Sequence, residues 1–245
     1  MIRKRTRQRG NSLVELMVAT VLLTMLLGVI YSAFASQGHT YAAQTQLTET
    51  MTGVRAALQV MTDQIALAGY GVPSANSPST ATKLVTATSS TLTFVANINC
   101  VQSFLSAGAS KNAGSIQLVS SAGFEVQDAI YVSDGSNWYS GAVSSMNGNT
   151  LNVTPALTFA FAAGTPVNPV NSVTFRFEDG RLKRNDQSVA GNVTGITFTY
   201  DSAQLSAIRR IGVTLSAQTR SLVGSNGQPL AVSLSTEVAP KNLGL

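Results

Sequence analysis

The residues with the clearest chemical potential lie near the start of the chain. Gly10 and Glu15 are preceded by a group of five cations, Arg3, Lys4, Arg5, Arg7 and Arg9. Residues 11–35 are otherwise apolar or neutral, so Glu15 is their single charge. A charged side chain near the centre of a membrane helix costs roughly 2.5–3.5 kcal/mol on insertion scales, and such residues usually mark function. Glu15 therefore predicts a partner of opposite charge.

The apolar segment that holds Glu15, Leu13–Ala35, is long enough to cross a bilayer. A membrane helix needs about 20 residues, whereas the apolar region of a secretory signal has only about 7–15. The preceding cations predict that residues 1–10 stay cytoplasmic and that the chain after residue 37 faces outward. No Ala-x-Ala-like cleavage site follows the segment, so we expect the helix to remain in the mature protein. Alternatively, Ser12 and Glu15 have the spacing of a helix capping box.

Residues 10–16, Gly-Asn-Ser-Leu-Val-Glu-Leu, resemble the processing site of type IV prepilins. The resemblance implies that prepilin peptidase cuts after Gly10, that Asn11 becomes the N-methylated mature terminus, and that Glu15 sets assembly and register. In this family the glutamate pairs with the terminal amine of a neighbouring subunit. Two charges that are each costly in lipid become tolerable when they meet at short range. The family usually has phenylalanine or another apolar residue at the position of Asn11.

The net charge and the cysteine content limit the functions and the cross-links that the chain could have. Lys and Arg number 16 against 11 Asp and Glu, but five of those cations lie in residues 1–9, which leaves a mature chain of zero formal net charge. The basic isoelectric point therefore reflects a topology signal, and we do not expect DNA binding. The single cysteine, Cys100, excludes an intramolecular disulfide. We expect Cys100 to be a small buried hydrophobic residue.

A second part of the helix is predicted to be amphipathic. Apolar residues recur at spacings of three and four and would pack on a sheet: Leu47, Met51, Val54, Leu58, Met61 and Ile65. We predict one long helix over residues 11–71, with a membrane or filament-core part at 11–37 and an amphipathic part at 38–69. Gly69, Gly71 and Pro73 would end it.

The remaining chain is predicted to be antiparallel β-structure. Short β-branched and apolar runs alternate with the hairpin signals Asp134-Gly135, Asn147-Gly148 and Asp179-Gly180. The predicted strands are 92–98, 115–119, 129–133, 138–145, 150–153, 173–178, 181–184, 196–201, 208–218 and 230–236, with one more near 83–88. The fold class is therefore α+β. We assign residues 72–99 and 170–245 to a pilin-like β domain and residues 100–169 to an inserted β module.

Both ends of the chain resemble PilW-like minor pilins and the related J-type pseudopilins of type II secretion. The similarity lies in residues 54–71, 173–184, 196–200, 208–215 and 234–242. It implies a minor pilin that contributes to pilus assembly initiation or to the tip complex. The alternatives are a J-type pseudopilin and, in another class, an adhesive or ligand-binding tip module at residues 100–169.

The resemblance also implies partners and a location. The partners would be major and minor pilins or pseudopilins, the prepilin peptidase and methyltransferase, and the inner membrane. The protein would be an inner-membrane protein with a single span and a periplasmic C-terminal domain before assembly. After assembly it would lie in the pilus at the cell surface.

Enzymatic activity, cofactors and metals are not predicted. The single histidine, His39, lies just past the apolar segment. A catalytic Ser/His/Asp triad in the domain after residue 37 would therefore have to include a histidine from the helix. Asp128, Asp134 and Asn137 could hold Ca²⁺ through oxygen ligands, but ordinary turn chemistry is the preferred interpretation. For Trp138-Tyr139 we favour cross-strand packing over recognition of a partner.

Overall fold

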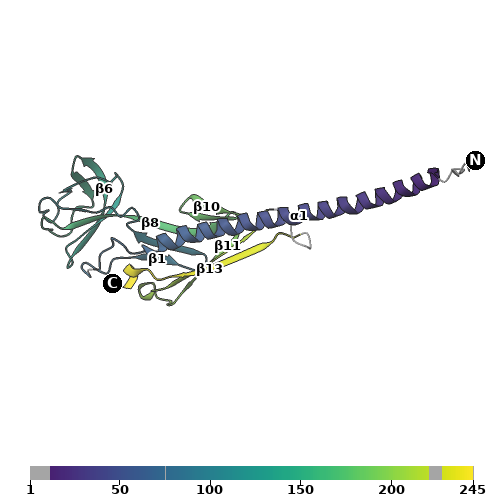
Figure 1. The fold of residues 1–245 in the computed structure, drawn as a ribbon. Coiled ribbons are helices and arrows are strands. Elements are labelled where there is room, and N and C mark those ends of the chain that lie inside the picture. The colour runs from purple at the N-terminus through teal and green to yellow at the C-terminus, as the bar shows by residue number, and fades with distance from the viewer. Residues whose placement is uncertain (1–11, 75, 221–227, 245) are drawn as a thin grey trace, which may run out of the picture. The chain divides into compact units, whose positions relative to one another are not determined.

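The computed structural model describes residues 12–74, 76–220 and 228–244 (Figure 1). The leader, Gly10 and Asn11 lie outside the described residues. A single helix, α1, runs from Ser12 to Ala66 and is followed by antiparallel strands, which confirms the α+β class. Two units are recognised by their internal contacts: residues 1–49 with 219–230, and residues 50–218 with 231–245.

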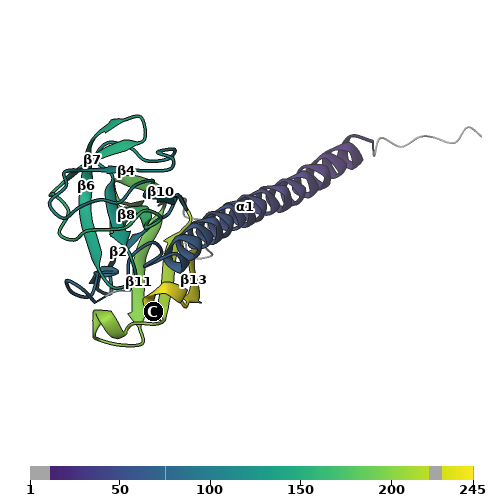
Figure 2. The ribbon, with the colours of Figure 1, turned by 90° about the vertical axis from the view of Figure 1, so that its left-hand side faces the viewer.

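The strands of the second unit form two antiparallel sheets. The larger sheet has the order β1-β2-β8-β5-β6-β7-β4, with β3 and β9 also paired to β8 and β10 paired to β9. Its strands are β1 (Leu84–Ala87), β2 (Thr91–Ala96), β3 (Ser103–Phe104), β4 (Ser115–Gln117), β5 (Ala129–Ser133), β6 (Trp138–Asn147), β7 (Thr150–Thr154), β8 (Pro166–Glu178), β9 (Arg181–Arg184) and β10 (Gln187–Gly191). Figure 2 shows β4, β6 and β7 next to one another.

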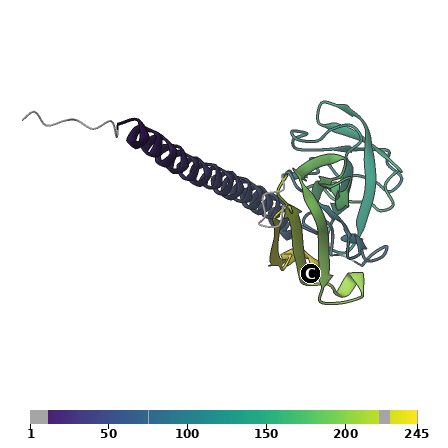
Figure 3. The same ribbon diagram turned by 90° about the vertical axis from the view of Figure 1, so that its right-hand side faces the viewer.

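The smaller sheet has the order β11-β12-β13, and its last strand is drawn in yellow near the C-terminus (Figure 3). Its strands are β11 (Val193–Tyr200), β12 (Ile211–Gln218) and β13 (Ala231–Val238). Two short 3₁₀ helices, η1 (Leu205–Ala207) and η2 (Lys241–Gly244), complete the described elements.

Strand β8 belongs to both halves of the larger sheet. Its first residues pair with β3 and β5, from Pro166 to Val170, while residues 171–178 pair with β2 and β9. Each half has its own apolar core. One core contains residues between Leu105 and Val167, and the other contains β1, β2, β9, β11 and β12 with the second part of β8. Residues 100–169 thus include a separate core, joined to the rest by a continuous strand.

The C-terminal part of α1 buries one face in the second of these cores. Val54, Leu58, Met61 and Ile65 have at most 7% of their surface exposed, and Ala57 lies among them. Their period of three and four residues matches the helical repeat, so all of them point to the same side. Leu47 and Met51, which continue the same pattern toward the N-terminus, are half-buried.

Two glycines shape the end of α1. Gly69 (φ +80°) and Gly71 (φ +76°) adopt left-handed backbone conformations, which end a helix at little steric cost. The Gly69 N–H donates to the Val95 carbonyl over 2.9 Å, and the Asn97 N–H donates to the Tyr70 carbonyl over 2.8 Å. These bonds hold the chain after α1 against the end of β2.

Several strand boundaries differ from the sequence prediction. Strand β8 begins at Pro166, seven residues before the predicted start at Val173. Strand β12 begins at Ile211 and not at residue 208, because the side chain of Asp201 accepts the Arg209 N–H over 2.9 Å and holds that segment in a loop. Strands β3 and β10 were not predicted, since two or five mostly polar residues give no periodic signal.

The prediction for Cys100 is wrong. Cys100 is exposed and has a positive φ of 53° in the turn after β2. The buried residue of this turn is Asn97, whose side chain donates to the Val101 carbonyl over 2.5 Å and accepts the Val101 N–H over 3.1 Å. A buried amide that pairs with the backbone on both sides satisfies its own polar groups. Asn97 therefore takes the interior position, and Cys100 is left outside.

Candidate functional site

Glu15 lies in the first turn of α1 with its side chain exposed. It is surrounded along the helix by Val14, Val18, Ala19 and Leu22. Between Gly10 and Glu49 the sequence contains no other Asp, Glu, Lys or Arg. A carboxylate in the first turn is favoured by the free N–H groups and the positive end of the helix dipole. Glu15 is thus an isolated charge on an apolar helix.

The apolar side chains around Glu15 cover every side of this part of α1. All described residues from Leu13 to Ala42 are exposed. The large apolar residues with more than half of their surface exposed include Leu13, Leu16, Met17, Leu22, Met25 and Leu27. A soluble chain rarely exposes an apolar surface of this size, and such surfaces mark interaction sites with proteins or membranes. The segment therefore requires an apolar environment from outside the chain.

The threonine and serine hydroxyls of residues 13–35 are satisfied within the helix. The hydroxyls of Thr20, Thr24 and Ser32 donate to the carbonyls of Met17, Val21 and Val29 over 2.8–2.9 Å. Backbone and hydroxyl groups must find such partners inside a bilayer, because no water is available there. These bonds have no signature in the residue pattern. Among residues 13–35, Glu15 remains the single charged side chain.

The length of the segment suits a membrane. Residues 13–35 rise about 35 Å at 1.5 Å per residue, compared with about 30 Å for a hydrocarbon core. By length and composition, α1 is the one described helix that could span a membrane. Gly28, inside this segment, has open space around it, so a neighbouring helix could approach its backbone closely.

The prokaryotic N-terminal methylation motif matches residues 5–31. The match covers the last leader cations, Gly10, Asn11, Glu15 and most of the apolar segment. Together with the apolar helix, it supports a type IV pilin-like prepilin. No curated protein and no solved structure matches the chain.

The motif and the apolar N-terminal helix support anchoring of the chain in a membrane. Its motif implies processing by prepilin peptidase and assembly with other pilins or pseudopilins into a filament. Proteins of this kind are structural subunits. The predicted cleavage at Gly10 and methylation of Asn11 lie outside the described residues, as do the leader cations Arg3, Lys4, Arg5, Arg7 and Arg9.

The candidate Ca²⁺ ligands of the outer domain cap turns. Asp134 Oδ1 accepts the N–H groups of Ser136 and Asn137 over 2.8 and 2.7 Å, and these backbone hydrogen bonds hold the pKa of the Asp134 carboxyl below its usual value. Asp128 Oδ2 accepts the Glu125 N–H over 2.8 Å. Both carboxylates therefore perform the local turn chemistry that we preferred for them.

Trp138 and Tyr139 point to opposite sides of β6. Tyr139 is buried, and its hydroxyl donates to the Pro155 carbonyl. Trp138 packs edge-on against Tyr131, with ring centroids 5.5 Å apart, and its Nε1 donates to the Ser79 carbonyl over 2.6 Å. These contacts fix the β5–β6 hairpin to residues 77–79, where the Trp138 N–H also bonds the Ser77 carbonyl. Packing accounts for both aromatic side chains.

Proposed function

We propose that the chain is a minor pilin of a type IV pilus and acts in assembly initiation or in the tip complex. Residues 1–10 are the leader, α1 is the assembly helix, and the β domain faces the periplasm before assembly and the cell surface afterwards. The observation that carries the proposal is the isolated carboxylate of Glu15 on a helical segment, residues 13–35, whose apolar side chains are exposed on every side. A filament core of similar helices supplies apolar surroundings for residues 13–35 and a positive charge for Glu15.

Assembly begins with the leader in this proposal. The leader cations hold the N-terminus at the cytoplasmic side, and prepilin peptidase cuts after Gly10. Asn11 then becomes the methylated terminus, and residues 13–35 pack among other pilin helices. Methylation leaves the terminal amine basic, so a positive charge is available at the start of every processed subunit.

Glu15 pairs with the terminal amine of a neighbouring subunit. An unpaired carboxylate in a low-dielectric environment carries a desolvation cost of several kcal/mol, and a nearby opposite charge offsets it. Because the helix itself supplies no such charge in residues 13–48, the pair forms only when subunits meet. The Glu15 contact therefore fixes the axial register of one helix against another.

The outer domain supports the minor-pilin role. Residues of the inserted module form one of its two largest apolar cores. A subunit with such an addition suits a position that occurs once, at the tip, better than a position repeated along the fibre. A J-type pseudopilin would share the same helix and the same pairing, and the test below separates the two roles.

The test of assembly uses a matched pair of variants on one helix. We expect Glu15→Ala to abolish incorporation of the protein into filaments, measured by immunoblotting of sheared fibres. Glu49→Ala removes an exposed carboxylate from the same helix and is expected to incorporate normally. Mass spectrometry of the mature terminus is expected to give N-methylated Asn11 in both. Normal incorporation of Glu15→Ala would refute the pairing.

A strain that lacks this protein distinguishes a pilus subunit from a subunit of a secretion system. Loss of surface pili with unchanged secretion of exported proteins would support the minor pilin. Loss of secretion with normal pili would replace this proposal by the pseudopilin alternative.

A further inference from the structure

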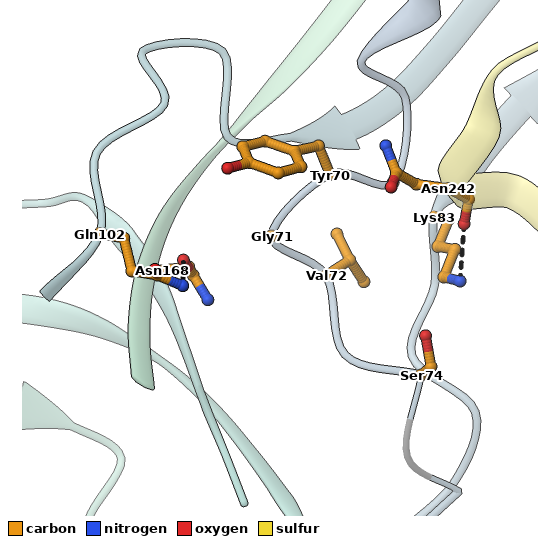
Figure 4. A pocket seen from close by; sticks show the side chains of 9 residues that line it. Tyr70, Gly71, Val72, Ser74, Lys83, Gln102, Asn168 and Asn242 are labelled. Carbon is orange, nitrogen blue, oxygen red and sulfur yellow. Dashed lines mark hydrogen bonds between the residues drawn. The ribbon is translucent and has the colours of Figure 1, made fainter. Parts of the chain in front are cut away.

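A small polar pocket lies where the chain leaves α1. It has a volume of about 220 Å³, and its walls come from five segments of the second unit: residues 69–74, Lys83, Gln102, Asn168 and Asn242. Figure 4 shows the side chains of Gln102 and Asn168 on one side, those of Lys83 and Asn242 on the other, and Ser74 below. No motif pointed to these residues, because they meet only in the folded chain.

The lining groups are mainly neutral hydrogen-bonding groups. Gln102 Nε2 donates to Asn168 Oδ1 over 3.2 Å, and each amide retains both donor and acceptor capacity. The Ser74 hydroxyl adds a group that can donate and accept. Lys83 is the single charged residue of the lining, and its Nζ donates to the Asn242 carbonyl over 2.8 Å. The amides and the Ser74 hydroxyl are directed groups that suit a neutral ligand with several hydroxyl groups.

The pocket is held in shape by the fold. The backbone on its inner wall is fixed by the bonds of Gly69 to Val95 and of Tyr70 to Asn97. A Cβ on Gly69 would lie 3.2 Å from the Asn242 carbonyl oxygen and 3.1 Å from Lys83 Cδ, so the walls approach each other closely. A wall that is already ordered loses little entropy when a ligand binds.

Tyr70 adds an apolar surface beside these polar groups. Its side chain is drawn at the upper edge of the pocket in Figure 4, and 38% of the residue's surface is exposed. An aromatic ring next to convergent amides and hydroxyls offers both a stacking surface and directed hydrogen bonds. A sugar ring presents the matching pair, an apolar C–H face and a rim of hydroxyls.

We infer that this pocket binds a single neutral pyranose ring, such as a terminal hexose of a surface glycan. Tyr70 packs on the C–H face, while Gln102, Asn168 and Ser74 bind the hydroxyls. This inference goes beyond the proposed assembly role, because it concerns what the outer domain contacts. It is tested without filaments, so its failure leaves the Glu15 pairing untouched.

The test uses the full chain in lipid nanodiscs, which avoids detergents with sugar headgroups. Saturation-transfer NMR is recorded with the methyl glycosides of glucose, galactose and mannose and with N-acetylglucosamine. We expect at least one of them to bind, and glycerol, which lacks the ring, not to bind. Gln102→Ala with Asn168→Ala is expected to weaken binding about tenfold, since one or two hydrogen bonds are lost.

A second variant protects the test against misfolding. Ser74→Tyr places a large side chain at an exposed position of the pocket and is expected to abolish binding without changing the thermal unfolding of the outer domain. Gln187→Ala, exposed on β10, is the matched control and should bind as the unaltered chain does. If none of the sugars binds, or if binding is equal in all the variants, the inference is wrong.

Discussion

The two parts of α1 differ in how their apolar side chains are covered, and this difference separates folding from assembly. In residues 50–66 one face is buried, with Met61 and Ile65 fully enclosed by strands. In residues 13–35 all faces are exposed, and Glu15 is the isolated charge. Substitutions in residues 50–66 should therefore change the stability of the β domain. Substitutions in residues 13–35 should change the interactions of the chain with other molecules.

Met61 and Met25 give the most direct test of this division. They are the same residue type on the same helix, with 0% and 66% of their surface exposed. We expect Met61→Ala to lower the free energy of unfolding by about 2–5 kcal/mol, because a buried methionine leaves a cavity. Met25→Ala should change it by less than about 0.5 kcal/mol. The fluorescence of Trp138, the single tryptophan, reports urea unfolding in the full chain.

Equal effects of the two methionine substitutions would contradict the comparison. A large effect of Met25→Ala on the outer domain would mean that residues 13–35 contribute to its folding. A small effect of Met61→Ala would mean that the core around α1 closes over the missing side chain.

Gly71 and Gly28 sharpen the same comparison through the backbone. Gly71 has φ +76°, and an added Cβ would lie 2.8 Å from Asn97 Cβ. Gly71→Ala should therefore destabilise the domain by about 1–3 kcal/mol. Gly28 is helical with open space around it, so Gly28→Ala should leave domain unfolding unchanged while it raises helix propensity by up to about 1 kcal/mol.

Thermal unfolding followed by circular dichroism measures both glycine variants. The sheet signal reports the domain and the helical signal reports α1. Unchanged domain stability in Gly71→Ala would show that the chain after α1 can rearrange around Asn97.

Features that depend on the local spacing of residues could be predicted from the sequence. The helix, the period that buries Val54, Leu58 and Ile65, and the Gly10 to Glu15 motif are all read within a few turns or residues. The hairpin signal Asp179-Gly180 is also local, because both residues adopt positive φ in the turn between β8 and β9. Local chemistry was sufficient for these features.

Long-range contacts explain what the sequence did not predict. Strand β3 is two residues long and exists because Ser103 and Phe104 pair with β8 more than sixty residues later. The buried position of Asn97 and the exposure of Cys100 depend on how the turn meets Val101 and Tyr70. The pocket joins Ser74, Gln102, Asn168 and Asn242, which no spacing rule connects. Each of these three features depends on contacts in the folded chain that residue spacing does not predict.

Acid sensitivity should come from the outer domain, where carboxylates have partners within the chain. The Asp134 pKa is lowered first by the Asn137 backbone N–H and also by that of Ser136. A lowered pKa in the folded state stabilises the domain above the unfolded value of about 3.9. This stability is lost as the pH falls below about 4 and through the lower pKa of the folded state. The effect is smaller than that of either core substitution, because Asp134 is exposed.

Thermal unfolding of the domain between pH 7 and pH 3 measures this contribution. Asp134→Ala should lower the midpoint at pH 7 and reduce the additional loss on acidification, since the carboxylate that gains a proton is gone. Ser136→Ala keeps the backbone N–H and should follow the unaltered chain. An unchanged pH profile in Asp134→Ala would assign the acid sensitivity to other carboxylates. In either case the response belongs to groups that are paired inside the domain, whereas Glu15 obtains its partner from another subunit in our proposal.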